Sequence, residues 1–496
     1  MIYFTLIAAR CSHTLLVIIL IFCVSSAVVA QDDFKPKLGF VDRPSLDMVA
    51  YPGDSTAEAV VLYDYGNVRF SFDQTKGLTM RMDCWMRVKI LKESALSRAS
   101  VALSYFDGSN FDKKETIESL KGFTYNVEGN QIVTTKLDNK TVKDEKSSDD
   151  YRTIKFNLPS VKKGSVIEYF YTRTTPLNLR NEPTTWRFQG DIPCKWSEYR
   201  IGIPYFLEYK MTLGGYIPLY INKQEHVDID VGYTPFKGQG IDYRFVVKDV
   251  PAFLDEPFIT TEVDYVSKIR FELASTNLPG YGTRRYSQTW ENVDRTLESV
   301  PWFGGELRKS AYLKEVRDEI LKSSSEPLER MNRAYAYMQS NMKWDGYFGI
   351  ASKEGAKRAF DNKKGNVSDI NLALISLLRD MDLDCNPVVL STRSHGRVSQ
   401  EIPMLESFNY VIGHVKIGDK EYFLDATQPY ARPGLVPEHT LNGVGRLVPK
   451  KGQGRFVEVN SKESKSKLEM INVEVDPEGG ILKGTYSMSY GGYEAL

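Results

Sequence analysis

The most constraining feature of this 496-residue chain is an apolar pattern of helical period at residues 367–381. Six apolar residues recur there at intervals of three and four: Ile370, Ala373, Leu374, Leu377, Leu378 and Met381. This spacing places them on one face of an α-helix. A glycine-containing stretch, Lys363-Lys364-Gly365, comes directly before and supplies a turn. The sequence therefore predicts a core helix with one buried stripe.

A different period precedes this helix, from Ala57 onward. Alternate apolar residues fall on one face of a predicted strand: Met80, Met82, Cys84, Met86, Val88 and Ile90. Further short strands are expected at 101–106, 123–127, 131–137, 153–158, 165–171 and 243–247. Many short strands with little helical period are typical of an antiparallel β-sandwich, which we assign to residues 57–278.

The second half of the chain mixes both periods. Helices are expected near 290–300, 313–320 and 328–338 before the central helix, and strands near 386–393, 407–417 and 420–427 after it. Helices followed by a sheet indicate an α+β core over residues 279–455. Alternation returns from about Leu468, and residues 456–496 are predicted to begin a C-terminal β domain that continues beyond this sequence, because so short a stretch cannot bury a core of its own.

The N-terminal segment carries an export signal. Thr14 to Ala30 is a run of 17 residues without a charge, and small residues precede Gln31. We predict a signal peptide at 1–30 and a linker at 31–56, hence export to the periplasm, the outer membrane or the medium. The alternative is an uncleaved membrane anchor, for which 17 apolar residues are at the short limit.

Composition excludes several classes of function. Lys and Arg together number 64, as do Asp and Glu, so the basic excess expected of a nucleic-acid-binding protein is missing. Cys84, Cys194 and Cys385 remain after the predicted signal and have neither disulfide-framework nor zinc-site spacing. We therefore expect no metal and no cofactor.

Three short motifs stand out in the second half of the chain: Gly365-Asn366-Val367-Ser368-Asp369, Phe408-Asn409-Tyr410-Val411-Ile412 and Leu424-Asp425-Ala426-Thr427. They resemble the active-site motifs of the transglutaminase-like superfamily of papain-like cysteine acyltransferases. In that family the positions of Val367, Tyr410 and Asp425 hold the nucleophilic cysteine, the histidine and the aspartate. The resemblance thus implies a transglutaminase-like α+β core with a degenerate triad, in which ordinary acyl transfer is lost.

A second resemblance lies upstream. Residues 157–169 and 186–193 are similar to an exported bacterial domain of unknown function that typically precedes a transglutaminase-like domain. It implies an architecture and no chemistry.

Other residues could replace the missing groups. Ser368 adjoins the nucleophile position but is predicted to cap the helix, and Cys385 is predicted to be a packing residue. His414 would face Asp425 if the hairpin loop were Asp419-Lys420, whereas a Gly418-Asp419 loop would put Ile412 there. His226, His395 and His439 are dispersed.

These patterns favour a catalytically inactive, exported protein that binds an envelope protein, peptide or glycan in the bacterial envelope. One alternative is an active cysteine acyltransferase or peptidase with a displaced nucleophile. Another is a carbohydrate-binding module on the β-sandwich. We expect membrane contact only through an uncleaved signal segment. We also expect Val367, Tyr410 and Asp425 to cluster, with the phenol bonded to Asp425 or to the backbone.

Overall fold

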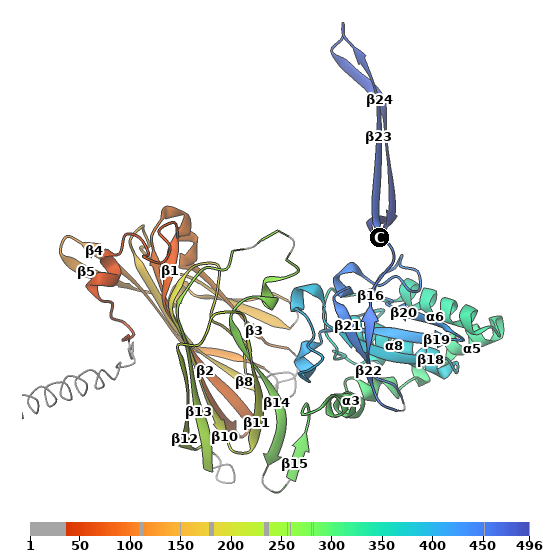
Figure 1. Cartoon of the computed structure of the whole chain (residues 1–496), viewed down its shortest axis with the longest axis horizontal. Helices are drawn as coiled ribbons and strands as arrows, with labels where there is room; N and C mark the ends of the chain where they lie inside the picture. Colours follow the sequence, from red (N-terminus) through yellow and green to blue (C-terminus); the bar gives the residue numbers. More distant parts are fainter. Residues whose placement is uncertain are drawn as a thin grey trace, which may run out of the picture.

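A computed structural model describes residues 36–495 except 109–113, 149, 178–182, 233–237, 255, 258, 279, 281 and 451. The predicted signal peptide lies outside these residues. Most of the described chain forms β-strands in several separate sheets, and the helices gather in the second half (Figure 1). The protein is therefore mainly β and divided into more than one packed region.

The largest sheet has eight strands in the order β12-β13-β10-β1-β2-β8-β4-β5. The strands are β1 (Ala59–Asp73), β2 (Gly77–Ile90), β4 (Thr116–Glu128), β5 (Gln131–Lys136), β8 (Val166–Pro176), β10 (Cys194–Pro204), β12 (Ile221–Ile229) and β13 (Gly238–Val250). The prediction of a purely antiparallel sheet is wrong at one pair, since β1 and β10 run parallel. Such a pair needs a long crossover, which here contains β2 to β9.

Two smaller sheets cover one face of the large sheet. One contains β9 (Trp186–Arg187), β11 (Leu207–Gly214), β14 (Lys268–Leu278) and β15 (Gly282–Arg285); the other contains β3 (Ser100–Phe106), β6 (Lys143–Lys146) and β7 (Tyr151–Asn157). Phe70 and Met82 share an apolar cluster with Phe271 of β14, and Val88 shares another with Phe156 of β7. Burial of these side chains holds the layers together.

The opposite face of β2 is also covered at its C-terminal end, where Arg87 and Lys89 are buried, contrary to the prediction that only one face is buried. Residues 36–56, expected to be a linker, form helix α2 (Arg43–Asp47) and pack there through Val41 and Leu46. The guanidinium of Arg87 donates to Phe40 O at 2.8 Å and forms a buried ion pair with Glu168. These contacts satisfy the charges that alternate with the apolar residues of β2.

The second half of the chain packs helices against a five-stranded sheet. The helices are α3 (Trp290–Ser299), α4 (Gly304–Leu307), α5 (Lys314–Ser323), α6 (Pro327–Asn341), α7 (Ala356–Asp361) and α8 (Val367–Asp380). The sheet runs β20-β19-β18-β21-β22, built from β18 (Asp384–Leu390), β19 (Tyr410–Ile417), β20 (Lys420–Leu424), β21 (Gly443–Leu447) and β22 (Arg455–Val459). A short parallel pair, β16 (Lys343–Trp344) and β17 (Lys364–Gly365), lies at the entrance to α8.

Helix α8 is buried on every face, not along one stripe as its period suggested. All residues from Val367 to Leu378 are buried. The helix lies against β18 and β19 on one side and contacts α4, α6 and α7 on the others. Small polar residues lie on the faces outside the apolar stripe. They can be buried because their side chains form hydrogen bonds within the core, as Asn371 does to Val411 O and Ser376 to Leu372 O.

The last two strands form a separate hairpin, β23 (Lys465–Asp476) and β24 (Ile481–Gly492), which projects away from the rest of the molecule (Figure 1). Strand β22 pairs with β21. Residues 456–459 therefore complete the five-stranded sheet, and the boundary that we expected at 455/456 falls inside a strand.

Candidate functional site

The candidate site begins at the first turn of α8. Asn366 Oδ1 accepts the Asp369 N–H at 2.9 Å, and Asp369 Oδ2 accepts the Asn366 N–H at 3.1 Å, which is a capping box. The prediction that Ser368 caps the helix is therefore wrong, because it lies inside the helix. Its hydroxyl donates to Gly349 O at 2.7 Å. Val367 is the first helical residue and is completely buried.

Asp425 follows β20 and is completely buried. Its Oδ1 accepts hydrogen bonds from Asn371 Nδ2 at 3.0 Å and from the N–H and hydroxyl of Thr427 at 3.0 and 2.8 Å. Its Oδ2 accepts the Tyr410 hydroxyl at 2.7 Å. Both carboxylate oxygens are thus satisfied by protein donors, as a buried carboxylate requires.

Tyr410 is the first residue of β19 and is also completely buried. The expected bond between its phenol and Asp425 is present. Burial and the neighbouring carboxylate of Asp425 raise the pKa of Tyr410 well above its ordinary value. The phenol therefore stays protonated and donates to Asp425, in contrast to a histidine, which could accept a proton at neutral pH.

His439 joins this group, although the sequence gave no reason to select it. It lies in a short 3-10 turn, Glu438–Thr440, and its ring centroid is 5.2 Å from that of Tyr410 and 5.0 Å from that of Phe348. Phe348 in turn stacks on Trp344 at 5.5 Å. Burial lowers the pKa of His439, against an opposing effect of Asp425. We call Trp344, Phe348 and His439 the aromatic layer.

Burial favours the neutral form of the His439 ring, and the ring is incompletely bonded. Its Nε2 is buried and has no hydrogen-bond partner among the described residues. No hydroxyl or thiol is therefore paired with this nitrogen in the described part of the chain. No local motif marks His439, because only the path of the loop after β20 brings it over Tyr410.

His414 does not join the site. Ile417 pairs with Lys420, so the hairpin loop is Gly418-Asp419, the second of the two alternatives. This register places His414 opposite Phe423. Its Nε2 lies 3.2 Å from Glu421 Oε2 on the neighbouring strand, so the ring contacts Glu421 and not Asp425.

Cys385 is remote from the start of α8. It lies in β18, after the end of this 14-residue helix, whose axis is about 20 Å long at 1.5 Å per residue. The thiol is buried, and burial raises its pKa to about 12. Such a thiol has almost no thiolate at neutral pH, and the thiolate is the reactive form.

Within the described ranges, no cluster of three or more His, Cys, Asp or Glu side chains could hold a metal ion. No helix in this part of the chain is long and apolar enough to cross a membrane.

Comparison with known proteins supplies two further findings. Residues 86–253 match the model of a domain of unknown function with a solved structure, DUF3857. The fold resembles a crystal structure described as "a putative protease from Parabacteroides distasonis ATCC 8503", with a TM-score of 0.59 over 81% of this chain and 72% of the other. The two sequences are 14% identical, so this likeness shows the fold alone. No curated protein matches the chain.

Proposed function

We propose that this chain is an exported transglutaminase-like protein of the bacterial envelope that no longer transfers acyl groups and acts by binding. The observation that carries this proposal is the closed set of hydrogen bonds around Asp425, whose two carboxylate oxygens accept from Asn371, Thr427 and Tyr410. The positions that correspond to a nucleophile and a base hold side chains that do neither task, and the carboxylate is used as an internal hydrogen-bond acceptor. The fold likeness and the DUF3857 match support the architecture.

Covalent catalysis needs a nucleophile that can ionise next to a base. Val367 cannot ionise. The Ser368 hydroxyl donates a hydrogen bond to Gly349 O, and its side chain lies about 100° around the helix from that of Val367. His439 could accept a proton, but its free nitrogen faces no hydroxyl or thiol among the described residues. The groups present can therefore hold a ligand but cannot attack it.

The alternative of a displaced cysteine nucleophile receives little support. Cys385 is buried, carries a raised pKa and lies beyond the far end of α8 from Val367. The N-terminal end of a helix favours a thiolate, whereas this thiol follows a C-terminal end.

The aromatic layer is the surface that we assign to ligand binding. Phe348 is 40% exposed, and the adjacent Tyr347 is 38% exposed. Exposed rings offer large apolar faces at low conformational cost, on which a peptide side chain can stack. Tyr410 supports this layer edge-on from below, with ring planes at 62° to Phe348 and 67° to His439.

A carbohydrate-binding sheet face remains the second candidate. Tyr63 and Tyr65 of β1 are nearly parallel, with ring centroids 5.7 Å apart, and Trp85 packs edge-on against Tyr63 at 4.8 Å. Tyr65 and Trp85 are half-buried, so their outer faces could stack on a sugar ring. Glycan-array binding by the chain that is lost in Trp85→Ala would favour this candidate.

A two-part experiment tests the proposal. The chain is incubated with a blocked glutaminyl-glycine dipeptide and a fluorescent primary amine, and covalent incorporation is measured. We expect none. Incorporation that disappears in Cys385→Ser would contradict the proposal and restore the displaced-cysteine alternative. Non-covalent binding of a fluorescent peptide is then compared for wild type, Phe348→Ser and the control Tyr216→Ser, whose ring is 86% exposed in the β-rich part. Only Phe348→Ser is expected to weaken it.

A further inference from the structure

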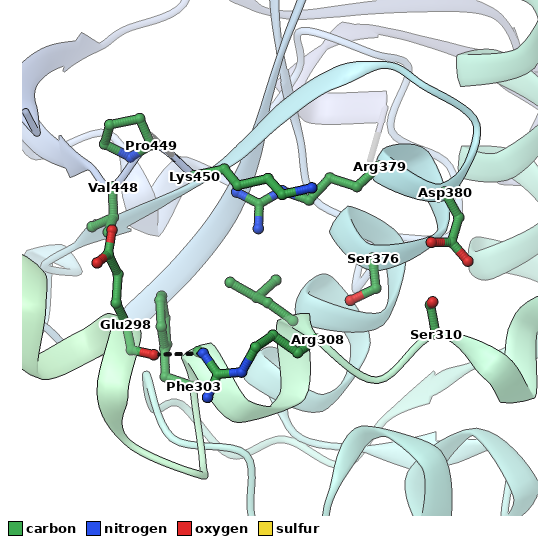
Figure 2. A pocket seen from close by; sticks show the side chains of 12 residues that line it. Glu298, Phe303, Arg308, Ser310, Ser376, Arg379, Asp380, Val448, Pro449 and Lys450 are labelled. Atoms are coloured by element: carbon green, nitrogen blue, oxygen red, sulfur yellow. Dashed lines mark hydrogen bonds between the residues drawn. The ribbon is translucent and has the colours of Figure 1, made fainter. Parts of the chain in front are cut away.

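A cavity of about 460 Å³ opens at the C-terminal end of α8 (Figure 2). Its lining includes Ser376 and Arg379 from the last turns of this helix. Val367 lies twelve residues before Arg379, about 18 Å along the axis, so the cavity is separate from the candidate site. The volume is within the range of small-molecule sites, roughly 300–1,000 Å³.

Three cations from three segments border this cavity: Arg308 after α4, Arg379 of α8 and Lys450 after β21. Figure 2 shows Arg379 and Lys450 on one side, with Arg308 across the cavity from them. Asn386 organises the first side, because its Oδ1 accepts both Arg379 Nη2 at 2.9 Å and the backbone N–H of Lys450 at 3.0 Å.

These cations keep donors free for a ligand. Arg308 Nη1 donates to Glu298 O at 2.9 Å. The Nε and Nη2 groups of Arg308 have no acceptor among the described residues. Arg379 donates from Nε to Cys385 O and from Nη2 to Asn386 Oδ1. Its Nη1 has no acceptor among the described residues. The exposed ammonium of Lys450 likewise has no acceptor in the described part of the chain. Burial lowers the pKa of Arg379, the effect of a cation whose lost hydration is not fully replaced.

Two carboxylates also line the cavity, but they do not cancel the positive charge. Asp380 Oδ2 lies 3.8 Å from Arg317, which is not part of the lining. Glu298 has no cation within ion-pair distance among the described residues. Partial burial and the charge of Asp294 raise the pKa of Glu298. The three cations therefore exceed the one carboxylate that is free to oppose them.

We propose that this cavity binds a small organic oxyanion, in which a carboxylate or phosphate group is carried on a short apolar body. The Nε and Nη2 edge of Arg308 matches the two oxygens of such a group, and Lys450 and Arg379 supply charge from the opposite side. Phe303, Leu307 and Val448 provide an apolar wall for the body of the ligand. Mostly apolar walls with a few converging polar groups are typical of ligand sites.

Isothermal titration of the whole chain with two probes, inorganic phosphate and isovalerate, tests this inference at constant ionic strength. Saturable binding of at least one probe is expected, and the probe that binds identifies phosphate or carboxylate as the preferred group. Lys450→Ala and Arg308→Ala should each weaken binding about tenfold or more, since each removes a charge-assisted contact. Glu298→Gln should strengthen it, because a repelling charge is removed. Lys357→Ala removes an exposed cation that pairs with Asp361 elsewhere and should change nothing.

The inference is overturned if neither probe binds saturably, or if Lys450→Ala binds like wild type. Weaker binding by Glu298→Gln would also contradict it, because the carboxylate would then assist the ligand. Lys450→Ala is the deciding variant, since its side chain is exposed and its backbone bond to Asn386 is unaffected. None of these variants alters the aromatic layer, so the outcome is independent of the proposed function.

Discussion

The polar groups at the two ends of α8 differ in whether they have hydrogen-bond partners inside the protein. At the N-terminal end, the carboxylate of Asp425 is completely buried, and both its oxygens accept hydrogen bonds from Asn371, Thr427 and Tyr410. At the C-terminal end, Arg308 and Lys450 point donors into an open cavity without protein acceptors in the described chain. The first end is closed on itself and the second is left open.

This difference separates structural polar groups from groups available to a ligand. A buried group with all its partners inside the protein contributes to stability and has no capacity left for another molecule. A cation that faces a cavity without a protein acceptor contributes little to the fold but can be satisfied by an anion. The residues that resemble an active site therefore lie at the N-terminal end of α8, which is closed. The cations that are available to a ligand lie at its C-terminal end, which is open.

The largest effect should follow from disturbing the closed end. Asp425→Asn replaces an acceptor oxygen by an NH₂ group that meets the donors of Asn371, Thr427 or Tyr410. We expect the free energy of unfolding to fall by about 1–3 kcal/mol, measured by urea denaturation. Asp419→Asn, in the exposed hairpin loop, is the control. An unchanged unfolding curve for Asp425→Asn would break the comparison, because the carboxylate would then not be structural.

A second experiment asks whether the closed end can be made reactive. Val367→Cys alone should alkylate slowly with iodoacetamide, because the side chain is buried and burial disfavours a thiolate. Val367→Cys combined with Tyr410→His adds a smaller, basic ring that the proposed triad would place next to the thiol, with Asp425 to orient it. We expect an alkylation rate about tenfold higher, since lowering a thiol pKa from about 8.5 toward neutrality raises the thiolate fraction by that order.

Equal alkylation rates for the single and the double variant, with both folded, would show that positions 367 and 410 do not face each other. The transglutaminase-like assignment of these positions would then be withdrawn. Thermal unfolding of each variant is the control for folding.

A smaller effect concerns pH. The folded-state pKa of His439 is lowered by burial, so below the ordinary value of about 6.5 the unfolded chain binds more protons than the folded one. Stability from the neutral imidazole is therefore present above pH 6.5 and is lost as the pH falls through the folded pKa. His439→Phe should lose less stability than wild type between pH 7.5 and 5.5, measured by urea unfolding. Identical losses would mean that this imidazole is solvated.

The smallest effect is expected at the open end. Lys450→Ala removes an exposed side chain that has no acceptor among the described residues. The free energy of unfolding should change by less than about 0.5 kcal/mol, in contrast to Asp425→Asn. A larger loss would mean that Lys450 has a structural role and would remove the contrast between the two ends.

Local patterns predicted much of the secondary structure. The helical period located α8, and the period near 328–338 located α6. The alternation in β2 identified one apolar face correctly. It did not reveal that residues 36–56 cover the opposite face, because Arg87 and Lys89 look like solvent-exposed charges until their backbone acceptors are known.

The candidate site was also predictable only in part from the sequence. The types of side chain at 367, 410 and 425 follow from the sequence, which also left two hairpin loops open for His414. The structure has the Gly418-Asp419 loop. The two alternatives differ by two residues in the strand pairing, so both keep the same faces of β20, and the alternation of side chains could not distinguish them.

The sequence by itself thus determined which side chains stand at the three positions of the resemblance, with no nucleophile at 367 and no imidazole at 410. Tertiary structure alone decided which distant residues come together. The loop after β20 carries His439 onto Tyr410, and three segments distant in the sequence bring Arg308, Arg379 and Lys450 to one cavity. The physical reason is that periodicity reports only which face of an element is buried, whereas these groupings arise from the packing of elements that are far apart along the chain.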